Sequence, residues 1–150
     1  MKDVTIFLKS IRRKRLELRT LQENADELRG MLLPKAITYD RDKVQTSPEE
    51  KLSQIVANLI AVEKHQEVLA NRLSKDILIA EQLIGTMTTP EYRELIRLRY
   101  LSGGTKPLTW EQIAEKMGYT PVHVRGKLHG KAIKEARAVW KENTPEYIPR

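Results

Sequence analysis

The residues best suited to chemistry in this chain are basic side chains near its C-terminus. Between Thr120 and Lys141 there are six lysine or arginine residues and one acidic residue, Glu135. Residues 1–90 are nearly balanced, with 15 basic and 13 acidic residues, so the excess of the +7 formal charge lies in the C-terminal segment. Clustered cations of this kind are suited to binding the phosphates of nucleic acid. The alternative is a solvated basic helix in a small bundle.

The sequence offers no residues that are suited to catalysis or metal binding. His65, His123 and His129 lie far apart or on the basic segment, and they have no metal-ligand spacing. Gly103 and Gly104 stand between expected helices and follow no strand, so they do not make a phosphate-binding loop. No carboxylates are paired in an apolar setting that would favour acid–base chemistry. We therefore expect neither an enzyme nor a bound metal or cofactor.

The element that must position the cations is a helix-turn-helix over residues 109–137. Thr109 is expected to cap its first helix, and Gln112, three residues later, completes a capping box. Gly118 suits the left-handed residue that ends this helix. In proteins built this way, the second helix enters the major groove of DNA.

The second helix of the motif is expected to begin after Thr120 and to continue to about Glu142, with Pro121 in its first position. Its outer face and the two caps supply the candidate DNA-binding residues: Thr109, Thr120, Val122, His123, Arg125, Gly126, Lys127, Lys131, Lys134 and Arg137. The first members of the outer face, from Val122 to Lys127, would lie at base edges or nearby phosphates. The later cations would grip the backbone, and the capped helix ends could receive phosphates.

The expected inner face of the two helices is apolar. It is formed by Ile113, Ala114, Met117, Val124, Leu128, Ile133 and Ala136. Gly126 would permit close approach of a phosphate or base edge, or would simply weaken the helix. Trp110 and Trp140 are interpreted as packing residues, in preference to platforms for base stacking.

Three further helices are expected before the motif. Apolar residues recur about every 3.5 positions from Val4 to Leu33, and again from Leu52 to Met87. A polar linker, residues 34–47, separates these two helices, and the third covers residues 90–101. Domain 1–89 is thus expected to be a helical hairpin or coiled coil that oligomerises the protein, domain 90–142 a three-helix DNA-binding domain, and 143–150 a flexible tail. The fold class is all-α.

The second long helix is expected to start at Ser47, which forms a capping box with Glu50, and to run for about 38 residues. Such a helix needs a partner, either the first helix folding back antiparallel or a second protein chain. Gln66 and Asp76 fall on or near its apolar stripe, where they either fix the register or reach solvent. The run Arg12–Arg15 covers a full turn, so it is a solvated face or a second DNA-backbone contact.

Composition limits the compartment and the partners. The chain has 150 residues, 31% of them charged, and only 5% aromatic. The absence of cysteine excludes disulfides and thiolate zinc sites and fits a reducing cytosol. No apolar run approaches about 18 residues and no export signal begins the chain, so neither membrane association nor secretion is expected. We expect a cytoplasmic protein of a bacterial host.

The segment EQIAEKMGYTPVHVRGKLHGKAIKEAR resembles the C-terminal DNA-binding domain of sigma factors, particularly the extracytoplasmic-function type, and YRELIRLRYLSG resembles that domain's preceding helix. The whole chain is similar to phage late transcriptional regulators of the RinA and ArpU kind. That second resemblance is carried by DRDKVQTSPEEKL, EYRELIRLRYL, LTWEQIAEKMGY and VRGKLHGKA. The loop SGGTKPL is longer than is usual for the sigma domain. The sigma-factor domain that binds melted promoter DNA is also not expected, so the chain is not interpreted as a complete sigma factor.

The resemblance implies binding to duplex DNA and activation of phage or prophage late genes, with RNA polymerase as a further candidate partner. Homodimers or higher homo-oligomers are expected through the long helices, because paired readers bind more tightly than one. The alternatives are a packaging adaptor similar to a terminase small subunit, and a module that binds RNA polymerase instead of DNA.

Overall fold

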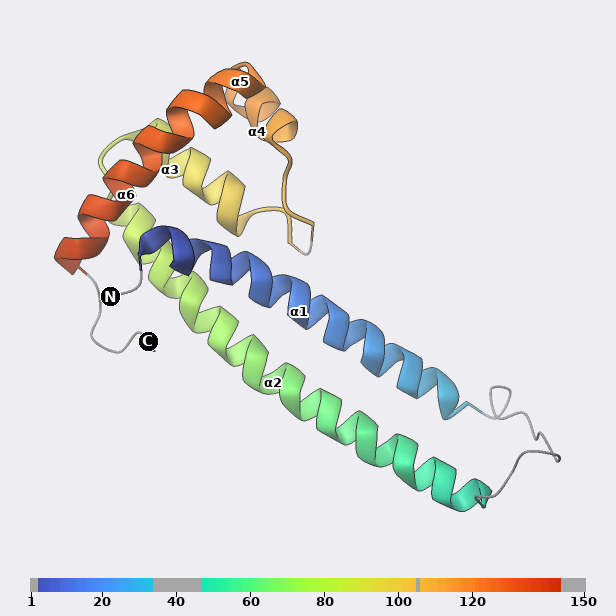
Figure 1. Cartoon of the computed structure of the whole chain (residues 1–150). Coiled ribbons are helices and arrows are strands. Elements are labelled where there is room, and N and C mark those ends of the chain that lie inside the picture. Colours follow the sequence, from blue (N-terminus) through green and yellow to red (C-terminus); the bar gives the residue numbers. More distant parts are fainter. Residues whose placement is uncertain (1–2, 34–46, 105, 144–150) are drawn as a thin grey trace. The chain divides into compact units, whose positions relative to one another are not determined.

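A computed structural model describes residues 3–33, 47–104 and 106–143, and all regular elements within these ranges are helical. The expected all-α fold class is therefore confirmed. The helices in chain order are α1 (Val4–Met31), α2 (Pro48–Thr86), α3 (Pro90–Ile96), η1 (Arg97–Leu101), α4 (Trp110–Met117), α5 (Pro121–His123), η2 (Val124–Leu128) and α6 (His129–Asn143) (Figure 1). The linker after Leu33 and the C-terminal tail, for which the sequence makes predictions, lie outside the described residues.

The chain divides into two compact units. One contains Met1–Leu16 and Leu73–Arg150, and the other contains Glu17–Arg72. This division differs from the expected boundary between residues 89 and 90. The reason is that the first turns of α1 and the last turns of α2 pack into the same core as the C-terminal helices.

The smaller unit is an antiparallel pair formed by the C-terminal part of α1 and the N-terminal part of α2 (Figure 1). Gln66 donates a hydrogen bond to Gln22 over 2.9 Å, and Arg29 forms a 2.8 Å salt bridge with Glu63. Of the two partners considered for the second long helix, the first helix folding back therefore fills this role in the smaller unit. Ser47 caps α2 as expected, because its hydroxyl accepts a hydrogen bond from the Glu50 amide at 3.3 Å.

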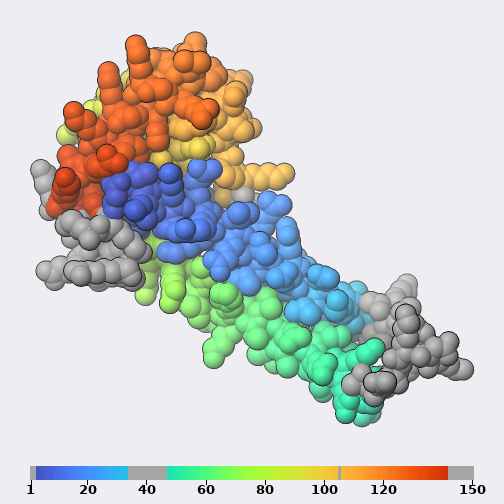
Figure 2. All heavy atoms as spheres, viewed as in Figure 1, coloured from blue at the N-terminus to red at the C-terminus, as the bar shows by residue number. Residues whose placement is uncertain are grey.

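The larger unit has a continuous apolar core to which both ends of the chain contribute. Its most deeply buried side chains come from α1, the end of α2 and the C-terminal helices: Val4, Leu8, Ile11, Ile84, Met87, Leu95, Ile96, Ile113 and Val124. Phe7 of α1 stacks on Trp140 of α6 with ring centroids 4.8 Å apart. In Figure 2 the N-terminal turns of α1, in dark blue, lie against the red atoms of α6. Trp140 is thus a core residue, as expected.

Asp76 is buried in the larger unit, where the Lys14 ammonium pairs with its carboxylate. The interpretation that Asp76 simply reaches solvent is therefore wrong, since its exposed fraction is only 7%. A carboxylate that is buried on the apolar stripe of α2 must be paired with a cation, and the facing helix α1 can provide one. Lys14 supplies that cation, so it does not belong to the solvated part of the run Arg12–Arg15.

Candidate nucleic-acid interface

The two helices of the expected motif are joined by a short turn whose hydrogen bonds are local. The Thr109 hydroxyl accepts a hydrogen bond from the Gln112 amide at 3.2 Å, and the Gln112 side chain accepts one from the Thr109 amide at 2.9 Å. This capping box fixes the start of α4. Gly118 ends the helix at φ 76°, a left-handed conformation that L-residues other than glycine adopt at a cost. The next amide, of Tyr119, donates to the Ala114 carbonyl at 3.0 Å and closes the turn.

The second helix begins as expected. The Thr120 hydroxyl accepts a hydrogen bond from the His123 amide at 3.2 Å, and Pro121 occupies the first helical position. Val124 and Leu128 point into the core, where Ile113 and Ala114 of α4 are also buried. Because Ala114 carries only a methyl group, the two helices can cross closely at that point. The local sequence thus holds the second helix with its other face directed outward.

A widened turn distinguishes the second helix from the regular helix that the sequence predicts. Residues Val124–Leu128 form a π-helical turn, η2, in which the His129 amide donates to the Val124 carbonyl. Gly126 lies in the middle of this turn, and a Cβ added there would meet no atom within 4 Å. Packing within the chain therefore does not require glycine at this position. Its backbone is open to solvent, in keeping with the close approach considered from the sequence, and π-helical turns occur frequently at functional sites.

The outer face of this helix is exposed and cationic. Val122 is 82% exposed, and the side chains of Arg125, Lys127, Lys131 and Lys134 are also exposed. None of these four cations forms a salt bridge with a carboxylate in the described part of the chain. They are therefore available to phosphates or base edges.

Two candidate residues have partners within the chain. His123 is half-buried and lies beside the Tyr119 ring, with centroids 5.1 Å apart. Arg137 forms a two-pronged pair with Asp3, through contacts of 2.9 and 3.1 Å. The hydrogen bond from Arg137 lowers the pKa of Asp3, and the same pair raises the pKa of Arg137. A backbone phosphate would compete with the Asp3 carboxylate for Arg137.

Glu135, the one acid in the basic segment, is engaged away from the cationic face. Its carboxylate accepts hydrogen bonds from the Thr88 amide at 2.6 Å, the Thr88 hydroxyl at 2.9 Å and the Thr89 amide at 3.1 Å. Partial burial raises the pKa of Glu135, but the hydrogen bonds from Thr89 and Thr88 outweigh it and lower the pKa overall. The acid therefore ties α6 to the segment between α2 and α3, and it does not neutralise the outer cations.

A polar and aromatic cluster beneath the second helix was not predicted from the sequence. The His129 Nε2 and the Tyr100 hydroxyl form a 2.8 Å hydrogen bond, and Trp110 meets the His129 ring edge-on at a centroid distance of 5.0 Å. The Arg99 guanidinium lies 4.1 Å from the Trp110 ring centroid and donates to the Leu108 carbonyl at 3.2 Å. The cluster joins η1, α4 and the start of α6, so it fixes the direction in which the second helix leaves the turn.

The electrostatics of this cluster reflect burial and neighbouring cations. Burial lowers the pKa of His129, and Arg99 and Lys9 lower it further. Burial also lowers the pKa of Arg99, with added repulsion from Arg12 and Arg125. Burial raises the pKa of Tyr100. His129 is therefore held as the neutral ring near neutral pH, which suits its hydrogen bond with Tyr100.

Comparisons with protein families, curated proteins and solved structures give no match to this chain. Among the described helices, none is long and apolar enough to cross a membrane. The described residues also contain no group of three or more histidine, aspartate or glutamate side chains placed to hold a metal ion.

Proposed function

We propose that this protein binds duplex DNA through the helical segment that begins at Pro121, and that it regulates transcription. The observation that carries the proposal is the exposed face of this segment. There, Val122 projects into solvent and Arg125 and Lys127 have no carboxylate partner among the described residues. A capped turn and a buried inner face hold this surface outward, which is the arrangement by which a helix-turn-helix presents its second helix to the major groove.

Each exposed side chain has a suitable contact in this proposal. Arginine and lysine pair with the acceptor edge of guanine or with phosphates, and the methyl groups of Val122 can contact the thymine methyl. Lys131 and Lys134, further along α6, suit the flanking backbone. Thr120 holds the start of the helix, where backbone amides and the helix dipole favour a phosphate.

The transcriptional setting comes from the resemblance to phage late regulators of the RinA and ArpU kind, and activation of phage or prophage late genes is part of the same proposal. Pairing of two copies is also proposed. Two readers on one duplex would contact half-sites about 34 Å apart, or a multiple of that spacing, and their affinities would reinforce each other.

The test is a double variant, Arg125→Ala with Lys127→Ala, in the full chain. Binding to duplex DNA is measured by fluorescence anisotropy at several salt concentrations. If each side chain neutralises one phosphate, the slope of log affinity against log salt should become shallower by about 1.8. If one of them reads a base instead, affinity should fall by about tenfold or more, with a smaller change in slope.

The matched control replaces two exposed cations of α2, Lys64→Ala with Arg72→Ala, and removes the same charge. Equal affinity and equal slope in the two double variants would refute groove binding by this helix. Selection of genomic fragments bound by the full chain then distinguishes a transcriptional regulator from a packaging adaptor. Sites upstream of late operons support the regulator, whereas enrichment at packaging sites supports the adaptor.

A further inference from the structure

A second cationic site lies on α1, away from the proposed reading helix. A cavity of 270 Å³ is lined by Lys9, Arg12, Arg13 and Arg15, and none of the described residues that line it carries a carboxylate. Its other walls include Tyr100, Ser102 and Gly104. The volume lies just below the range of about 300–1,000 Å³ that is usual for small-molecule pockets. The cavity therefore suits one anionic group better than a whole cofactor.

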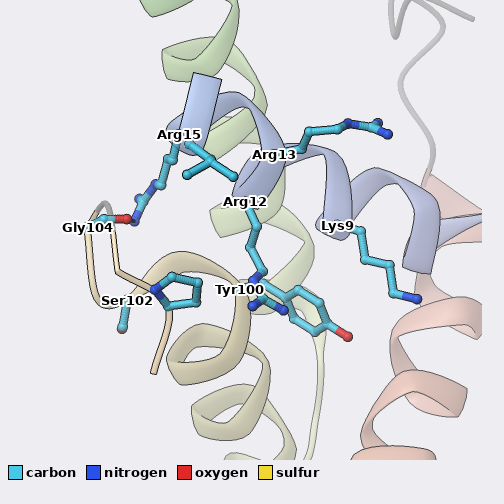
Figure 3. Close-up of a pocket in the computed structure, with 9 residues that line it drawn as sticks. Lys9, Arg12, Arg13, Arg15, Tyr100, Ser102 and Gly104 are labelled. Atoms are coloured by element: carbon cyan, nitrogen blue, oxygen red, sulfur yellow. Dashed lines mark hydrogen bonds between the residues drawn. The ribbon is translucent and has the colours of Figure 1, made fainter. Parts of the chain in front are cut away.

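The helical spacing explains why these cations gather. Lys9 and Arg12 are three residues apart, as are Arg12 and Arg15, so the three lie along one side of α1. Lys14 points to Asp76 and is neutralised there. Figure 3 shows Arg12 extending from α1 toward Tyr100, and Arg15 toward Gly104. The Arg15 guanidinium approaches the Gly104 carbonyl at 3.5 Å, the limit of a hydrogen bond, so it keeps its capacity for a stronger acceptor.

Arg12 supplies the observation that points to a ligand. Its Nε atom is buried and has no hydrogen-bond partner in the described structure. Such a donor is costly to leave unsatisfied, and more so when it belongs to a charged group. Arg12 also lies close enough to Arg99 to repel it. An anion in the cavity would pair with the Arg12 guanidinium and offset the repulsion.

Arg99 connects this cavity to the proposed reading helix. It precedes Tyr100, which lines the cavity and whose hydroxyl forms a 2.8 Å hydrogen bond with His129, the residue directly after η2. Arg12 and Arg125 both repel the Arg99 guanidinium. The cavity thus lies close to the start of the helix that the proposed function places on DNA. The phosphates of a DNA backbone are anions of the kind that such cations bind.

We propose that the cavity on α1 binds a phosphate of the DNA backbone, next to the groove that the helix starting at Pro121 enters. This inference rests on the proposed function. One phosphate held by Arg12 and Arg15 is a charge-assisted, two-sided contact. It positions the protein on the duplex and adds affinity without reading sequence.

The experiment uses the full chain with Arg12→Gln and Arg15→Gln, because glutamine keeps most of the apolar stem that packs on α1 and Tyr100. Binding to a short mixed-sequence duplex is measured by anisotropy between 50 and 200 mM salt. Loss of one phosphate contact should make the salt slope shallower by about 0.9. The affinity difference from the unaltered protein should then shrink by about 3.5-fold over this range. The matched control is Lys64→Gln with Arg72→Gln, and circular dichroism confirms that both variants are folded.

A slope and affinity equal to those of the control would overturn the proposal. A second arm titrates the protein with inorganic phosphate and follows the amide resonances of Ser102 and Gly104. Shifts that depend on Arg12 and Arg15, together with an unchanged DNA slope, would assign the cavity to a free phosphate-bearing ligand and would also overturn the DNA assignment. Failure of the reading helix is distinguishable, because it appears in the Arg125 and Lys127 variant and not in this one.

Discussion

Replacing Lys14 with methionine should destabilise the protein by about 2 kcal/mol. Breaking a fully buried ion pair costs about 3–5 kcal/mol, whereas an exposed pair contributes about 0–1 kcal/mol. The pair of Lys14 and Asp76 falls between these limits. The acid side chain is 10% exposed, and the lysine side chain is 28% exposed. Methionine preserves the length of the stem, so the main loss is the cation that compensates the buried carboxylate.

The reverse change should cost less. With Asp76→Leu, the Lys14 ammonium can turn to solvent and leucine fills a buried apolar position, so a loss of about 1 kcal/mol or less is expected. The double variant, with methionine and leucine facing each other, should recover to within about 1 kcal/mol of the unaltered protein, because apolar replacement of a buried pair is often neutral. The resulting cycle isolates the coupling between the two side chains.

Equilibrium unfolding in urea measures these differences, and thermal unfolding of the Lys14 variant should show a midpoint lower by about 4–8 °C. The control is Arg19→Met, which breaks the 3.1 Å salt bridge to Glu23, a pair with both side chains well exposed. If the Lys14 variant loses no more stability than the Arg19 variant, the Asp76 carboxylate is effectively solvated. The account of its burial is then refuted.

Three local features give further tests. Thr109→Ala should lower stability by about 1 kcal/mol in urea unfolding, because it removes the side chain that caps α4, and Thr109→Ser should retain most of it. Gly103→Ala should destabilise by at least about 1 kcal/mol more than Gly104→Ala. Both have positive φ, but only at Gly103 would the new Cβ lie 2.3 Å from the Lys106 carbonyl oxygen. Equal losses would contradict the predicted clash. Burial lowers the pKa of His129 in the folded protein, so the ring binds a proton more readily in the unfolded protein. Its stabilising contribution is therefore present above its unfolded pKa of about 6.5, and it is lost as pH falls from there toward the folded value. His129→Gln should flatten that part of the stability profile.

The caps and the turn could be predicted from the sequence because each depends on residues within a few positions of one another. Thr109 reaches only to Gln112, and Thr120 only to His123. Gly118 ends its helix by its own backbone freedom. The inner face was also predictable, since helical periodicity alone assigns it. These features need no knowledge of the rest of the chain.

The supporting contacts of the site could not be predicted in this way, because they join residues that are distant in sequence. Arg137 meets Asp3 from the opposite end of the chain, and Glu135 meets the amides of Thr88 and Thr89. Nothing in the local pattern distinguishes Arg137 from an unpaired lysine of the same helix. Only the fold of α1 onto α6 shows that one outer cation has an internal carboxylate partner.

The packing of α1 against the C-terminal helices leads to a last prediction: a fragment of residues 90–143 should not fold as the full chain does. It lacks Phe7, which stacks on Trp140, and it lacks the buried side chains of Leu8 and Ile11. Trp140 is 4% exposed in the full chain, so its fluorescence should shift to longer wavelength in the fragment, and thermal unfolding should lose its cooperativity.

The matched control keeps both parts of the larger unit. In it, residues 17–72 are replaced by a short glycine–serine linker, which is possible because the Lys14 and Asp76 side chains meet close to the two cut ends. This protein should retain the buried tryptophan signal and a cooperative transition. A 90–143 fragment that unfolds cooperatively with the same fluorescence would show that its helices need no partner from α1. In that case the boundary at residue 90 would describe the folding unit better than the division by packing.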